Sequence, residues 1–110
     1  MIIEHNWGSH REAYITEQYG KGIICAEIQR EDPNTCILHD LFVTPTHQRS
    51  GYGRKLMRKA LEYATRNGCR YAILFVAPDA EQWVQPWYER LGFKEYAIDK
   101  KGRCWLKKAV

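Results

Sequence analysis

The segment from Gln48 to Gly53 has the residue types of a phosphate-binding turn. It contains two glycines and stands between an apolar segment, Ile37 to Val43, and a helical pattern of apolar residues. A helix N-terminus presents unpaired backbone N–H groups and partial positive charge, and a glycine-containing turn lets a ligand approach them. This combination favours an anion such as phosphate. A plain strand-to-helix connection with a solvated basic first turn explains the turn alone equally well.

Two motifs in the sequence resemble the acetyl-CoA site of GNAT-type N-acetyltransferases. The first is Leu41-Phe42-Val43-Thr44-Pro45, followed by Gln48-x-x-Gly51-x-Gly53 at the start of an amphipathic helix. It is similar to the family signature Arg/Gln-x-x-Gly-x-Gly/Ala, which follows a strand ending in Val-x-Pro. The second motif is WYERLGF, from Trp87 to Phe93, which is similar to the family's Tyr-x-x-x-Gly-Phe helix end. The motifs occur in the family's order, and the resemblance extends roughly from residue 11 to the C-terminus.

The resemblance implies an acyltransferase that moves the acetyl group of acetyl-CoA directly to a primary amine of a small molecule or peptide. The cofactor contacts that it implies are Leu41, Phe42, Val43, Gln48, Arg49, Ser50, Gly51, Tyr52, Gly53, Arg54 and Asp79. Tyr88 matches the family tyrosine that protonates the departing thiolate, and a phenol with a pKa near ~10 suits that task. From the residue pattern alone, Tyr88 also fits a core aromatic that shares one helix face with Val84 and Leu91.

The group that accepts the amine proton is left open between two residues. His39 lies two residues before Leu41 and four before Val43, so on a regular strand these three side chains share one face and Asp40 points to the other. Some family members carry a histidine or glutamate on this strand for the task, and an imidazole titrates near neutral pH. Glu27 on the neighbouring strand is the rival. A solvated or hydrogen-bonded surface role for His39 is also open.

Asp79 has two interpretations. Many family members have an asparagine after the fifth strand that hydrogen-bonds the pantetheine arm, and no asparagine follows Asn67 in this chain. By this resemblance, Asp79 substitutes as the acceptor. Asp79 and Gln82 also have the spacing of a helix capping box, and capping is the simpler expectation.

The remaining segments predict one α+β domain over residues 1–110, with a mixed, mostly antiparallel sheet in the order β-β-β-α-β-α-β-β. The predicted strands are 11–17, 23–30, 37–43, 70–77, 93–99 and 103–108, and residues 1–10 are either irregular or a frayed edge strand. The first helix buries Leu56, Met57, Ala60, Leu61 and Ala64 and ends at Asn67-Gly68. The second begins near Val84 or Gln85, has Pro86 in its first turn and stops at Gly92. This order is that of the GNAT core.

The front of the chain departs from the family pattern. Typical members begin with a strand and one or two helices that help to form the acceptor pocket, and this chain has no room for those helices. The acceptor pocket is therefore in question, and a partner subunit in a homodimer is one way to complete it. The alternative function is a non-catalytic module that binds acetyl-CoA or CoA and regulates or recruits a partner.

The composition limits which kinds of binding site and which cellular compartment we expect for this protein. Cys25, Cys36, Cys69 and Cys104 form no C-x-x-C pair and the four histidines are scattered, so we expect no zinc site and reduced thiols in a cytoplasmic protein. No apolar run approaches the ~20 residues that span a bilayer. The net charge of +4 comes largely from Arg49, Arg54, Lys55, Arg58, Lys59 and Arg66. No aromatic platform is interleaved with them, so nucleic-acid binding is a minor hypothesis.

Overall fold

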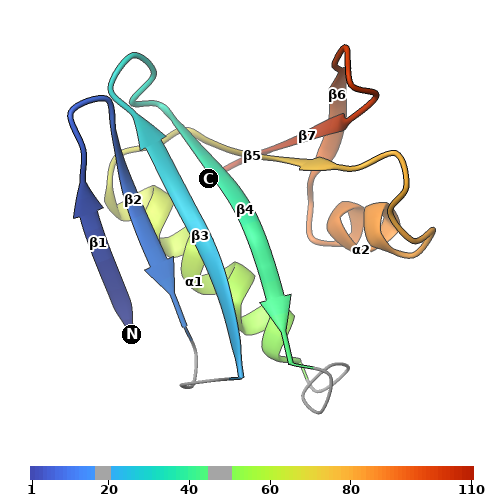
Figure 1. Cartoon of the computed structure of the whole chain (residues 1–110), viewed down its shortest axis with the longest axis horizontal. Helices are drawn as coiled ribbons and strands as arrows, with labels where there is room; N and C mark the ends of the chain where they lie inside the picture. The colour runs from blue at the N-terminus through green and yellow to red at the C-terminus, as the bar shows by residue number, and fades with distance from the viewer. Residues whose placement is uncertain (17–20, 45–50) are drawn as a thin grey trace.

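A computed structural model describes residues 1–16, 21–44 and 51–110 and contains one mixed β-sheet and two helices within these ranges (Figure 1). The strands are β1 (Ile2–Asn6), β2 (His10–Ile15), β3 (Gly22–Gln29), β4 (Thr35–Val43), β5 (Tyr71–Val76), β6 (Lys94–Ile98) and β7 (Cys104–Ala109), and the helices are α1 (Tyr52–Arg66) and α2 (Val84–Arg90). The α+β prediction is confirmed. The start of the chain forms a true edge strand, because β1 pairs antiparallel with β2.

The helix α1 covers one face of β2, β3 and β4, as Figure 1 shows. Ala13, Ala26 and Leu38 lie opposite one another in register across these three strands and are buried against the helix. From α1, the buried residues are Leu56, Met57, Ala60, Tyr63 and Ala64. The predicted apolar face is therefore correct, with Tyr63 as an added member and Leu61 at its partly buried edge.

The sheet runs in the order β1-β2-β3-β4-β5-β7-β6, and β4 and β5 form its parallel pair. This pair joins Thr35, Cys36 and Ile37 to Tyr71, Ala72 and Ile73. Beyond these residues the two strands diverge (Figure 1), and β5 continues with β7 as its antiparallel partner. The C-terminal halves of β4 and β5 are therefore apart. The first motif spans the end of β4 and the start of α1, and the second motif lies at α2, which follows β5.

The helix α2 begins at Val84 and carries Pro86 in its first turn, as predicted. Its N-cap is Trp83, and no described side chain caps it. The capping-box interpretation of Asp79 is therefore wrong, because Asp79 lies in the turn after β5, too far before Val84 to reach the first N–H groups of the helix. Within the described ranges, neither helix is long and apolar enough to cross a membrane.

Asp99 organises the turn of the β6–β7 hairpin. Its carboxylate accepts hydrogen bonds from the Trp105 indole at 2.9 Å, from Arg103 Nε at 2.7 Å and from the backbone N–H groups of Lys101 and Arg103 at 2.9 and 3.0 Å. These donors, led by the Trp105 indole, hold the pKa of Asp99 far below its ordinary value of 3.8. The ionised form is thus the one that the hairpin stabilises.

We expect Asp99→Asn to lower the melting temperature by several degrees at neutral pH, because the amide cannot reproduce this set of charge-assisted bonds. The pKa of Asp99 is lower in the folded state, so its contribution to stability is present above pH 3.8 and is lost as the pH falls further. In thermal melts from pH 7 to pH 2, the difference in melting temperature between the two proteins should shrink as the pH falls below 3.8. A difference that stays constant over this range, or a similar loss for the exposed control Asp32→Asn, would contradict this account.

Candidate active site

The start of α1 has the geometry of an anion site. Its N-cap is Gly51, with a backbone φ of 85° in the left-handed region that favours glycine. No described side chain caps this end, and the first turn contains no acidic residue. Among the described residues, no carboxylate or hydroxyl side chain takes the capping position that such a group usually occupies at a helix start. The preceding motif residues Gln48, Arg49 and Ser50 lie outside the described residues, so their roles stay predictions.

Basic side chains surround this helix start. The Lys21 ammonium donates to the Tyr52 hydroxyl at 3.1 Å and lies 5.2 Å from the centre of the Tyr52 ring. Lys55 lies 5.6 Å from the same ring centre, and Arg54 precedes it on the helix. Lys21 was not predicted at this site, because it comes from the segment before β3 and reaches the site only through the pairing of β3 with β4. These cations add to the partial positive charge of the helix end.

Residues of both motifs meet at Gly53. A Cβ atom built on Gly53 would lie 3.5 Å from Cζ2 of Trp87 and 3.9 Å from Cγ2 of Val43. The end of β4, the start of α1 and the helix α2 thus pack together at this residue. Leu41 and Val43 rest against the hydrophobic core, whereas Phe42 points outward with 55% of its surface exposed.

Tyr88 lies on α2 with its ring partly buried against the core. Its ring packs edge-to-face against Trp87 at 5.2 Å and against Phe93 at 6.1 Å between ring centres. Burial raises the pKa of Tyr88 above its ordinary value of 10.0. The phenol therefore carries its proton throughout the neutral range, which is the state that a proton donor requires. The packing and the chemistry are compatible, because a ring held by aromatic neighbours can still present its hydroxyl.

The prediction that His39, Leu41 and Val43 share one strand face is wrong. Asp40 has a backbone φ of 56°, and the β3–β4 register shifts between Ile23 and Cys25. Asp40 acts as the extra residue of a β-bulge, which reverses the alternation of side chains. Leu38 and Val43 therefore both face α1, although they are five positions apart, and His39 lies on the opposite face. A non-glycine residue at positive φ is strained, and such strain often marks functional positions.

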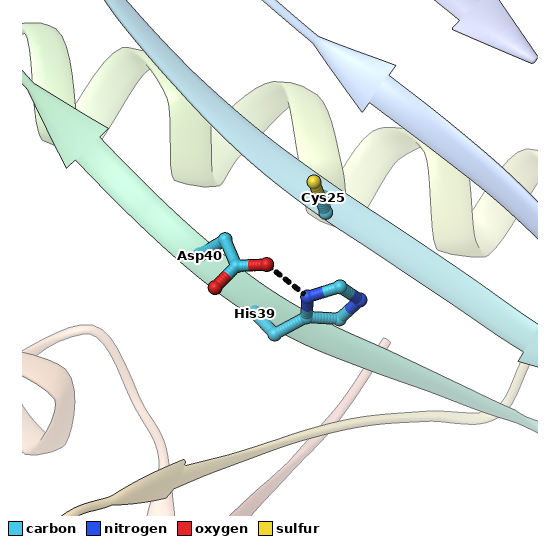
Figure 2. A group of neighbouring side chains, drawn as sticks. All are labelled: Cys25, His39 and Asp40. Carbon is cyan, nitrogen blue, oxygen red and sulfur yellow. Dashed lines mark hydrogen bonds and ion pairs between the residues drawn. The ribbon is translucent and has the colours of Figure 1, made fainter.

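The bulge places Asp40 beside His39 instead of across the strand from it. Figure 2 shows this pair on β4 with Cys25 on β3 next to it, in front of the sheet, while α1 runs behind. His39 Nδ1 donates to Asp40 Oδ2 at 2.8 Å, and His39 Nε2 lies 3.9 Å from Glu27 Oε1. Burial raises the pKa of the Cys25 thiol to about 11, so it stays protonated and is unsuited to act as a nucleophile. Of the Cys25, His39 and Asp40 side chains, the imidazole is the one suited to proton transfer near neutral pH.

Comparison with known sequences connects this arrangement to one family. The model of the acetyltransferase (GNAT) family matches residues 4–93. An uncharacterized N-acetyltransferase of Methanocaldococcus jannaschii is 36% identical over 63 residues, which are 57% of this chain and 27% of that protein. A UPF0039 protein of Schizosaccharomyces pombe is 30% identical over 76 residues, which are 69% of this chain and 49% of that protein. The chain spans about a quarter and about half of these two relatives.

Comparison with solved structures agrees in fold. PaiA N-acetyltransferase of Thermoplasma acidophilum, solved in complex with coenzyme A, has a TM-score of 0.73 at 20% identity over 92% of this chain and 60% of its own. IAA acetyltransferase of Bacillus cereus has a TM-score of 0.73 at 17% identity over 93% and 79%. An acetyltransferase of Streptococcus agalactiae has a TM-score of 0.69 at 20% identity over 92% and 67%. At these identities the similarity establishes the fold.

Proposed function

This chain belongs to the acetyltransferase (GNAT) family, and from that premise we propose that it transfers acetyl from acetyl-CoA directly to a primary amine of a small molecule or peptide. The observation that carries the proposal is the glycine-bearing start of α1, which no described side chain caps, beside the end of β4 and the α2 helix that bears Tyr88. The family relationship supports acetyl-CoA as the co-substrate. The acceptor side is supported by the proton-transfer groups on the face of the sheet opposite α1.

The described residues fit acetyl-CoA at two places. The N–H groups from Gly51 to Arg54 bind the pyrophosphate, with charge support from Lys21 and Lys55. Pairing of β4 with β5 ends at Ile37, so an extended pantetheine arm can lie along the β5-facing edge of β4 at Leu41, Phe42 and Val43. Gln48, Arg49 and Ser50 complete the pyrophosphate turn in this proposal. Asp79, in the turn after β5, accepts a hydrogen bond from an amide N–H of the arm, a role left open once capping is excluded.

The bound cofactor supplies a thioester as the acyl donor, and the chain supplies positioning and proton handling. The amine nitrogen forms a bond to the acyl carbon, and the bond from that carbon to sulfur breaks. His39 takes the proton that the amine loses, with Asp40 holding its ring through Nδ1. Tyr88 gives its proton to the departing thiolate, and both side chains return to their resting states by exchange with water.

Two measurements test this function, one of acetyl-CoA binding and one of acetyl transfer to an amine. Calorimetric titration of the protein with acetyl-CoA should show saturable binding. Incubation with acetyl-CoA and a panel of primary amines, including diamines, amino acids and peptides with free N-termini or lysines, should give one product whose mass has risen by one acetyl group. Binding with no transfer to any amine would favour the non-catalytic CoA-binding module. No binding would rule out both functions.

We expect His39→Gln to lower turnover by about 100-fold at neutral pH, because glutamine cannot accept the amine proton. Acetyl-CoA affinity should stay within about threefold of the wild type, since His39 lies on the opposite face from α1. Comparison of kcat with the calorimetric affinity measures both effects. The control His5→Gln removes an imidazole from β1 and should leave turnover unchanged. If Glu27→Gln lost turnover and His39→Gln did not, Glu27 would be the base.

A further inference from the structure

Four side chains on the sheet face opposite α1 converge from three adjacent strands. They are His10 and Glu12 on β2, Glu27 on β3 and His39 on β4. His10, Glu12 and Glu27 each offer a ligand atom within 4.8 Å of the other two. His39 Nε2 extends this group, at 3.9 Å from Glu27 Oε1. Imidazole nitrogens and carboxylate oxygens are ligands that Zn²⁺ and related ions prefer.

Each of the four side chains is held by a second partner on its other polar atom. His10 Nδ1 hydrogen-bonds Ser9 Oγ at 2.9 Å, Tyr14 donates to Glu12 Oε2 at 3.2 Å, Gln29 donates to Glu27 Oε2 at 3.0 Å, and His39 Nδ1 donates to Asp40 Oδ2 at 2.8 Å. The ligand atoms left to face one another are Nε2 of both histidines and Oε1 of both glutamates. His10 Nε2 and Glu12 Oε1 hydrogen-bond each other at 3.0 Å, a contact that a bound ion would replace. Metal ligands in proteins are oriented in this way by outer hydrogen bonds, which also select the histidine tautomer.

Charge on this face also favours a cation. Glu12 and Glu27 are direct cross-strand partners, and like charges in that position repel. The four side chains keep between 20% and 30% of their surface exposed, which leaves an ion access from solvent.

We propose that His10, Glu12, Glu27 and His39 bind a divalent transition-metal ion of the zinc type, with the first three as the core ligands and His39 completing the set. The sequence suggested no such site because its histidines are scattered, but the strand register brings two of them to one carboxylate pair. The proposal is independent of the acetyl-transfer function. A bound ion would engage Nε2 of His39, so it would also inhibit any reaction that uses this nitrogen as a base.

The neighbouring group of Cys25, His39 and Asp40 is the competing set of ligands. It shares His39 with the proposed site, but Cys25 is buried, with 5% of its surface exposed, which restricts the access of an ion to its sulfur. The two sets differ in spectrum, because Co²⁺ bound by a thiolate has an intense near-ultraviolet charge-transfer band and Co²⁺ bound by nitrogen and oxygen does not.

The experiment is a titration of tag-free protein with Zn²⁺ by calorimetry and with Co²⁺ by absorption, without acetyl-CoA. We expect one site per chain, a visible Co²⁺ spectrum and no thiolate band. His10→Gln and Glu12→Gln should each weaken Zn²⁺ binding more than about tenfold, and Tyr14→Phe, which removes an outer hydrogen bond, by about tenfold. Thermal melts of the metal-free variants confirm that they are folded.

The matched control is Glu4→Gln, which removes a carboxylate from the other face of β1 and should leave the Zn²⁺ affinity within about twofold. An affinity of the His10 and Glu12 variants equal to that of this control would overturn the proposal. A thiolate band that disappears in Cys25→Ser would overturn it in favour of the Cys25 set. Because metal binding is measured directly, either result leaves the test of acetyl transfer unaffected.

Discussion

Replacement of Gly51 by glutamate should weaken acetyl-CoA binding by at least about 100-fold. No described atom lies within 4 Å of the position that a Cβ would take, so the described part of the chain leaves space for the new side chain. Its carboxylate would stand at the helix start, where the proposed pyrophosphate binds. Two like charges about 4 Å apart near a protein surface repel by roughly 4 kcal/mol, which is more than enough for this loss. Calorimetric titration of the variant with acetyl-CoA measures it.

The control for this variant is Gly68→Glu, at the other end of α1. Gly68 has a φ of 81°, close to the 85° of Gly51, and likewise has none of the described atoms within 4 Å of its Cβ position. The two substitutions therefore carry similar backbone strain and the same added charge, and differ in the end of the helix that receives it. Gly68→Glu should bind acetyl-CoA as the wild type does. Equal losses in both variants would point to destabilised folding, and no loss in Gly51→Glu would remove the pyrophosphate from this turn.

Replacement of Tyr88 by phenylalanine should lower kcat about 100-fold or more and leave acetyl-CoA affinity nearly unchanged. The ring contacts with Trp87 and Phe93 are kept by phenylalanine, so the packing of α2 persists. The variant lacks the proton donor for the departing thiolate, and general acid catalysis is typically worth 10²–10⁴-fold. Steady-state kinetics with the best amine from the panel, together with calorimetry, separate turnover from binding.

The control for Tyr88 is Tyr96→Phe, which removes a hydroxyl from a half-exposed ring on β6 and should change neither quantity. Because burial raises the pKa of Tyr88, the wild-type rate should show no alkaline loss from this group until the pH exceeds its ordinary pKa of 10.0. Full turnover by Tyr88→Phe would exclude the phenol from the mechanism and leave Tyr88 as a core aromatic.

Much of the fold was predictable because its signals are local. The buried face of α1 follows from apolar residues at helical spacing, and its end follows from Asn67 and Gly68, where Gly68 adopts a φ of 81°. The start of α2 before Pro86 and the hairpin of β6 and β7 also follow from short-range residue preferences. The two motifs that resemble the GNAT family are similarly contiguous, so the sequence was sufficient to predict the family and its α+β class.

The features that needed the tertiary structure all depend on how strands pair. The bulge at Asp40 turns His39 away from Leu41 and Val43, and strict alternation along a sequence cannot predict an inserted residue. Lys21 reaches Tyr52 across 31 positions of sequence, and β1 is a strand because β2 lies beside it. The convergence of His10, Glu12, Glu27 and His39 has the same origin. The sequence states which residue types are present, but the cross-strand register sets the distances between their side chains. Those distances decide what chemistry this face of the sheet can perform.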